Sequence, residues 1–279
     1  MSVQVRVVTD PACAWSWGTE PKLRKLVWEF GEELDLRWVM GGMARTVGDA
    51  ERERYSESWL EVPAASGMPV DPRLWQRGGI SSTYPACQAV VAACEQGSEA
   101  GGRYLRRLRE GLLCELKRLD HPEALIAEAG AAGLDVQRFK LDLQSNAIVE
   151  AFGAHLDEAR CIPDKAKEEE ATGCTGPIER VTFPSLTFVH ADGSSRGVYG
   201  WRPYEEYRDA AVAAGASPSA RPAPEPLEVL DRLGRCATAE IEMLTGRPRV
   251  VVEAELWALA REWRLKPTMV LTGTMWERA

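Results

Sequence analysis

The chain has 279 residues, of which 45% are hydrophobic and 27% are charged. This hydrophobic content suffices for one large domain with an appendage or for two ordinary domains, and it excludes a disordered or fibrous chain. The net charge of -8 and the pI near 5.2 argue against a surface that binds nucleic acid.

The first forty residues alternate between strand and helix patterns. Residues 3–9 alternate β-branched side chains and stop at Asp10-Pro11, which predicts a strand. Apolar residues recur at helical spacing over 23–30, and Gly31 stands where helices commonly end. Alternation over 34–40 predicts a second strand. Together they predict a βαβ unit with a right-handed crossover and parallel strands.

The middle of the chain is predicted to be helical, and strands return after it. From Ser81 to about Arg160 the apolar residues follow helical periodicity almost throughout. Residues 184–189 then predict a strand, a hairpin turn at Asp192-Gly193 leads to a short strand near 197–199, and a helix follows. The predicted order is βαβ, a helical insertion, and ββα.

The last sixty residues predict a separate small module. Residues 216–226 are rich in Pro, Ala and Ser, which is typical of a linker. Residues 227–279 show three helical patterns followed by a β-hairpin pattern, which predicts a winged-helix-like module. Acidic and basic residues balance within it, so packing or dimerisation is favoured over DNA binding, and a homodimer stays open.

The seven cysteines predict reduced thiols. Their number is odd and their spacing matches no metal site, so neither a disulfide framework nor a bound metal is expected. The first nine residues lack the features of a signal peptide, and no stretch reaches the roughly 18 apolar residues of a membrane span. We therefore expect a cytoplasmic protein with no membrane partner.

Cys13 is the candidate nucleophile. It lies between the first predicted strand and helix, where free backbone N–H groups and the helix dipole lower a thiol pKa. The hydroxyl of Ser16, three residues on, can donate to the same thiolate. Trp15 and Trp17 flank the thiol and can form an apolar wall. The alternative is a small core cysteine in a strand-to-helix turn.

A second segment supports this interpretation. Phe183-Pro184 immediately precedes the returning strand. A proline at a strand entry is compatible with a cis peptide bond and with an open edge where a substrate backbone can pair. A simple turn proline is the alternative.

Several motifs in order resemble the DsbA-like thioredoxin superfamily, in particular its cytoplasmic FrnE-type branch. They are Asp-Pro-Ala-Cys-Ala-Trp-Ser-Trp-Gly at 10–18, Val-Met-Gly-Gly at 39–42, Ser-Gly-Met-Pro at 66–69, Ser-Thr-Tyr-Pro-Ala-Cys at 82–87 and Phe-Pro-Ser-Leu-Thr-Phe at 183–188. The resemblance implies an α/β thioredoxin fold with a helical insertion. We assign the thioredoxin-like domain to 1–54 and 174–215, the insertion to 55–173, the linker to 216–226 and the winged-helix-like module to 227–279.

The resemblance also implies a thiol-disulfide oxidoreductase that attacks protein or small-molecule disulfides. Cys13 would be the nucleophile and Pro184 would position the substrate, with Trp15, Trp17 and Phe183 as substrate-binding residues. Ser16 replaces the second cysteine of the family, so Cys13 would act as a monothiol. No resident cofactor is implied; a small thiol such as glutathione, or else Cys174, would resolve the mixed disulfide.

Two other functions stay open. Kappa-class glutathione transferases and hydroxychromene-carboxylate isomerases are similar around Cys13, although the motifs at 66–69 and 84–87 oppose them. A related branch comprises adaptors that deliver regulators to proteases, and loss of the second cysteine fits a redox site that has degenerated.

Overall fold

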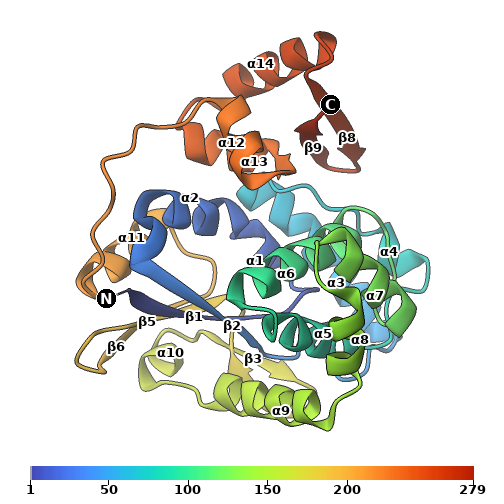
Figure 1. Ribbon diagram of the computed structural model, residues 1–279. Helices are drawn as coiled ribbons and strands as arrows, with labels where there is room; N and C mark the ends of the chain where they lie inside the picture. Colours follow the sequence, from blue (N-terminus) through green and yellow to red (C-terminus); the bar gives the residue numbers. More distant parts are fainter. Residues whose placement is uncertain (1) are drawn as a thin grey trace.

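The computed structural model describes residues 2–279 and has a four-stranded sheet at its centre. Its strands run in the order β2-β1-β5-β6 (Figure 1). β1 pairs with β2 in parallel and with β5 antiparallel, and β5 pairs antiparallel with β6. The predicted βαβ–ββα thioredoxin fold is therefore confirmed. The strands are β1 (Val3–Thr9), β2 (Leu34–Met40), β5 (Ser185–Val189) and β6 (Ser195–Tyr199).

Two helices cover one face of this sheet. They are α2 (Glu20–Phe30) and α11 (Tyr204–Ala213), which lie on the same side of the strands in Figure 1. Leu26 of α2 and Tyr207 of α11 bury their side chains against Val5 and Phe188 of the sheet. A short helix, α1 (Ala14–Gly18), precedes α2, and a single 3₁₀ turn (Gly31–Glu33) follows it. The pattern over 23–30 therefore predicted α2 but gave no sign of α1.

The helical insertion lies beside and beneath the sheet. Helical periodicity was predicted over 81–160 and helices are confirmed there. The helices α3 and α4 precede this stretch, and α3 begins at Asp49, before the assigned start of the insertion at residue 55. The insertion is held by a core that includes Trp59, Tyr104, Leu108 and Phe139. Its helices are α3 (Asp49–Ser66), α4 (Arg73–Gln76), α5 (Tyr84–Cys94), α6 (Ser98–Leu113), α7 (Pro122–Ala131), α8 (Val136–Leu143), α9 (Asn146–Arg160) and α10 (Asp164–Glu168).

A small hairpin joins the insertion to the returning strands. It consists of β3 (Thr172–Thr175) and β4 (Ile178–Val181), which pair antiparallel across a turn where Gly176 has φ +59°. No strand was predicted here, because four-residue polar strands carry little hydrophobic alternation.

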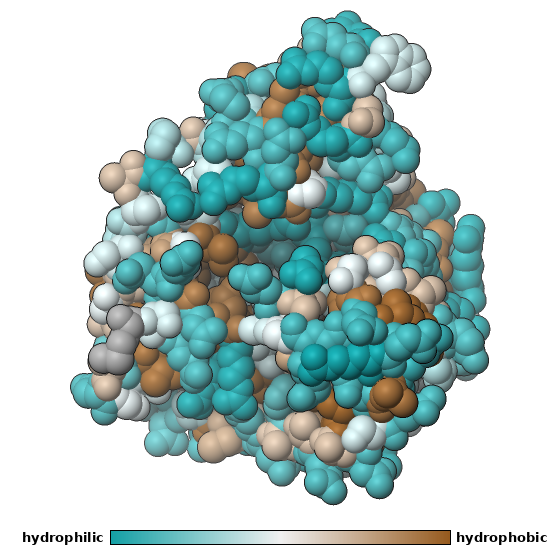
Figure 2. Space-filling model, in the orientation of Figure 1, coloured by the Kyte–Doolittle hydropathy of each residue, from teal (hydrophilic) through white to brown (hydrophobic). Residues whose placement is uncertain are grey.

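The C-terminal module has the predicted winged-helix order. Val229, Ile241, Leu256 and Trp276 form the centre of its own apolar core. It projects from one end of the molecule (Figures 1 and 2). Among residues 2–279 no helix could cross a membrane. The module contains α12 (Pro226–Leu233), β7 (Cys236–Ala237), α13 (Thr238–Thr245), α14 (Arg249–Arg261), β8 (Leu265–Val270) and β9 (Gly273–Arg278), with sheet order β7-β9-β8.

A buried ionic network fixes this module to the rest of the chain. Glu240 of α13 is fully buried and binds Arg24 of α2 at 2.8 Å and Arg106 of α6 at 2.6 Å. Arg106 also binds Glu110 at 2.7 Å. Charges removed from water are costly unless they are paired, so this arrangement favours one docked position of the module.

Candidate functional site

Cys13 lies at the junction between β1 and α1, as expected. It is the N-cap residue of α1, and its Sγ accepts a hydrogen bond from the backbone N–H of Ser16 at 3.4 Å. The same sulfur lies 3.8 Å from the carbonyl oxygen of Phe183, to which the thiol donates. The two segments singled out in the sequence therefore meet around one sulfur atom.

The buried carboxylate of Asp10 organises the turn that carries Cys13. Its Oδ1 accepts from the backbone N–H of Ala12 at 2.8 Å, and its Oδ2 accepts from Met43 N–H at 2.6 Å and from Thr83 Oγ1 at 2.7 Å. These bonds tie the turn after β1 to the loop after β2 and to the start of α5. Asp10 belongs to the motif at 10–18, but no role was predicted for its side chain.

The Phe183-Pro184 peptide bond is cis, as the sequence allowed. The Phe183 ring packs directly against Gly41, where an added Cβ would lie 2.1 Å from the ring's Cζ. Only glycine leaves room for the ring there. Gly41 of the Val-Met-Gly-Gly motif thus provides the space in which the Phe183 ring packs.

The hairpin of β3 and β4 covers this site. The Arg180 guanidinium lies 3.7 Å from the centroid of the Phe183 ring, and its Nε donates to Thr175 Oγ1 at 3.0 Å. Thr175 in turn donates to the carbonyl oxygen of Gly42 at 2.8 Å. Cys13 shares a buried cluster with Val181 of this hairpin and with Phe183, and it is only 5% exposed. Arg180 was missed from the sequence, because nothing local marks a hairpin arginine as a neighbour of residue 13.

Burial raises the pKa of the Cys13 thiol. Desolvation penalises the thiolate more than the backbone N–H of Ser16 and the positive charge of Arg180 favour it. The expectation of a lowered pKa at Cys13 is therefore wrong, although the Ser16 N–H at the helix start does favour the thiolate. A helix of only five residues beneath an apolar cover does not compensate for the loss of water.

The other residues expected at the site fall into different environments. Ser16 Oγ is buried and has no hydrogen-bond partner within residues 2–279. Trp17 is fully buried and donates from Nε1 to the carbonyl oxygen of Pro69 at 2.8 Å, which places its ring in the protein interior. Trp15 is partly exposed and packs on Trp201 with ring centroids 5.8 Å apart.

Cys174 lies on the hairpin but faces away from Cys13. It pairs with Glu179 across the hairpin, whereas Arg180, which packs on the Phe183 ring, pairs with Gly173. Successive side chains in a strand point to opposite faces. Both Cys174 and Glu179 are exposed, so they occupy the outer face. All seven cysteines are free.

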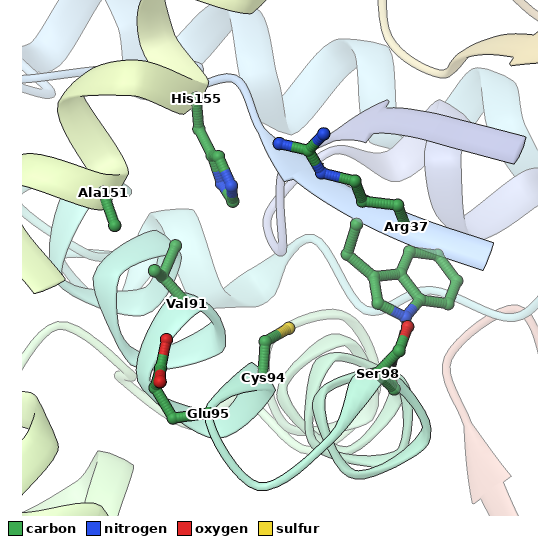
Figure 3. A pocket seen from close by; sticks show the side chains of 8 residues that line it. Arg37, Val91, Cys94, Glu95, Ser98, Ala151 and His155 are labelled. Carbon is green, nitrogen blue, oxygen red and sulfur yellow. Dashed lines mark hydrogen bonds between the residues drawn. The ribbon is translucent and has the colours of Figure 1, made fainter. Parts of the chain in front are cut away.

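A small pocket opens elsewhere, along the edge of β2 (Figure 3). Its volume is about 190 Å³, below the roughly 300 Å³ at which ligand sites begin. His155 borders it and accepts from the backbone N–H of Met40 at 3.3 Å, while burial lowers the pKa of its imidazole. Within residues 2–279 no cluster of three metal-ligating side chains occurs. The pocket is lined by Arg37, Trp38, Val91, Cys94, Glu95, Ser98, Ala151 and His155.

Comparison with known proteins identifies relatives over nearly the whole chain. A family model described as thioredoxin matches residues 7–161. The ClpXP adapter protein SpxH of Halalkalibacterium halodurans is 27% identical over 285 aligned positions, which cover 98% of this chain and 88% of the relative.

Solved structures resemble the chain in fold. A Nitrosomonas europaea protein, provisionally assigned as a protein disulfide isomerase, has a TM-score of 0.63 and 20% identity, covering 76% of this chain and 97% of its own. The cytosolic disulfide reductase DsbM of Pseudomonas aeruginosa has a TM-score of 0.55 and 20% identity, covering 83% of this chain and 100% of its own. DsbM has also been solved with GSH.

Proposed function

Because the chain belongs to the thioredoxin family, we propose that it uses this scaffold as a protein adapter, binding another protein and delivering it to a ClpXP-type protease. The observation that carries the proposal is the burial of Cys13, which is 5% exposed in a cluster with Val181 and Phe183, whose ring Arg180 in turn covers. A disulfide oxidoreductase attacks through an accessible thiolate, and here the thiol is covered and its pKa is raised. Ser16 replaces the thiol that would otherwise close a disulfide.

The similarity to the SpxH adapter supports the same function. The alignment covers 98% of the chain, so it continues past residue 161, where the thioredoxin match ends, into the C-terminal module. That module is held against the thioredoxin core by the Glu240 network, which gives one composite surface for partners. The proposed location is the cytoplasm, in keeping with seven free cysteines.

The test is degradation in a purified system. Proteins that the chain retains from a cell extract are purified one by one and incubated with ClpXP and ATP, with and without the chain. An adapter accelerates the degradation of at least one of them. If the chain accelerates none, the adapter proposal fails.

A second candidate, a monothiol oxidoreductase, is favoured by one observation. The Cys13 sulfur lies at a helix N-cap, 3.8 Å from the Phe183 carbonyl oxygen that precedes Pro184, and the nearby Ser16 hydroxyl is buried without a partner within residues 2–279. With the hairpin displaced, the Cys13 thiolate would attack a disulfide and form a mixed disulfide with one half, while the other half leaves as a thiolate. A glutathione thiolate would then attack that mixed disulfide at the substrate sulfur, which regenerates the Cys13 thiolate and leaves a glutathione-substrate disulfide.

Turnover of a small disulfide with glutathione tests the second candidate. Wild type, Cys13→Ala and Ser16→Cys are compared, and Ser16→Cys restores the spacing of a closing pair. An active monothiol enzyme requires wild-type turnover that disappears in Cys13→Ala. Equal background rates in wild type and Cys13→Ala would eliminate the oxidoreductase.

A further inference from the structure

The outer face of α14 is apolar and lacks any covering element. Val250, Ala254, Trp257 and Arg261 recur at helical spacing on that face and are exposed, Val250 by 72% and Trp257 by 43%. The Trp257 ring also packs edge-to-face on the buried Trp276, with ring centroids 5.0 Å apart, and its remaining surface is open to solvent. The opposite face, with Val252, Leu256 and Leu259, is buried in the module's core. We call the four exposed residues the α14 stripe. Val251 widens it on one flank.

An exposed tryptophan stands just beyond the stripe. Trp263 is 87% exposed and has φ +58°, in the left-handed region. Its N–H bonds to the carbonyl of Ala260, and that of Arg264 bonds to the carbonyl of Leu259, which is the Schellman arrangement. Glycine is the usual residue at this position, because a Cβ is unfavourable there. The fold therefore gains nothing from a tryptophan here, and its indole is free to contact a partner.

Charge decides among the candidate occupants of the stripe. Arg249 and Arg264 are paired with Glu253 and Glu262, whereas Arg261 has no ion pair within residues 2–279. Two antiparallel copies of α14 would bring Arg261 to the positive N-terminal end of the other helix, and parallel copies would place the two Arg261 side chains together. A second copy is thus electrostatically disfavoured.

DNA is disfavoured by the chemistry of the stripe. Reading base edges in a groove requires hydrogen-bonding side chains, and phosphate binding requires several basic ones. The stripe offers valine, alanine and tryptophan with one arginine. An apolar stripe with a single free cation instead matches a helix whose apolar face ends in a carboxylate.

We propose that the α14 stripe and Trp263 bind an amphipathic helix of another protein that carries a carboxylate beside its apolar face. This inference deepens the adapter function and rests on it for its biological role. Trp257 and Trp263 supply the apolar contact area, and Arg261 pairs with the carboxylate and sets the orientation of the bound helix.

The test uses two fluorescein-labelled synthetic helices that have the same leucine face and differ only in flanking glutamates or lysines. Fluorescence anisotropy with the full-length chain measures their dissociation constants. We expect the glutamate peptide to bind about fivefold more tightly, and Arg261→Glu to reverse that preference. Trp257→Ala weakens binding by about tenfold. Leu141→Ala, at a 73% exposed position on α8, serves as the matched control and has no effect.

Trp263→Gly separates binding from folding, since it weakens peptide binding without lowering the thermal midpoint. Equal binding of both peptides, or no loss in Trp257→Ala, overturns the inference. If the chain is a dimer that Trp257→Ala dissociates, the partner of the stripe is a second copy. If the chain binds duplex DNA and Arg261→Glu loses that binding, the partner is DNA. Either result contradicts the proposed helix. If Trp257→Ala and Arg261→Glu still accelerate ClpXP degradation, the α14 stripe does not bind the delivered protein, and the adapter function remains supported. If the chain binds the peptides but accelerates no degradation, helix binding by the stripe is supported and the adapter function is contradicted.

Discussion

Replacement of Glu240 by glutamine should loosen the C-terminal module. Glu240 is fully buried and binds the guanidinium groups of Arg24 and Arg106, whose side chains are also largely buried. Removing one partner of a buried ion pair costs about 3–5 kcal/mol, because the remaining charges are left without compensation. Glu20 and Glu110 still lie near these arginines, which favours the lower end, about 3 kcal/mol.

Native-state hydrogen exchange of the α13 amides measures this effect. A loss of about 3 kcal/mol in the free energy of opening corresponds to roughly a hundredfold faster exchange. Glu277→Gln is the matched control in the same module, because Glu277 forms an exposed pair with Lys266 at 3.0 Å. Such a pair contributes about 1 kcal/mol or less. If both variants exchange alike, the network does not dock the module.

Three other results are expected. Arg180→Ala should accelerate iodoacetamide labelling of Cys13, measured by peptide mapping. The substitution removes the side chain that packs on Phe183 and bonds Thr175, and we expect the gain in access to outweigh the loss of a charge that lowers the thiol pKa. An unchanged labelling rate would contradict this. The ion pairs of Glu115 lower its carboxyl pKa from 4.5 to about 2, so the stability that they contribute is present above pH 4.5 and is lost as the pH falls toward 2. In thermal unfolding, Glu115→Gln should therefore lose less stability than wild type over this pH range. Curves of midpoint against pH that run parallel for the two proteins would refute this. Trp263→Gly should stabilise the chain by about 1 kcal/mol in thermal unfolding, because it relieves a left-handed residue, and a lower midpoint would contradict this.

The sheet could be predicted because its strands carry strong local patterns. β1 and β2 alternate regularly, and the structure has them at 3–9 and 34–40 as expected. By contrast, α3 is 18 residues long and buries only Tyr55, Trp59 and Val62, at helical spacing, while Pro63, a residue that usually ends a helix, lies inside it. The polar hairpin of β3 and β4 shows no hydrophobic pattern that would predict its strands. Its strands form by pairing with each other over the site.

The candidate site could be predicted in its position but not in its chemistry. The sequence placed Cys13 at a helix start and Pro184 beside it, because each lies at the border of a predictable element. Its thiol pKa depends instead on burial by Phe183 and Arg180, about 170 residues away in the chain. No local pattern indicates such a contact, so the direction of the pKa shift expected from the helix N-terminus alone was wrong.

The most direct test of the adapter function compares wild type and Cys13→Ala in the ClpXP degradation assay. The rate at which ClpXP degrades a retained protein is measured without the chain, with wild type and with the variant. We predict that both forms accelerate degradation equally, because the buried thiol takes no part in delivery. Loss of the acceleration in a folded Cys13→Ala variant, or its absence with wild type, would contradict the account.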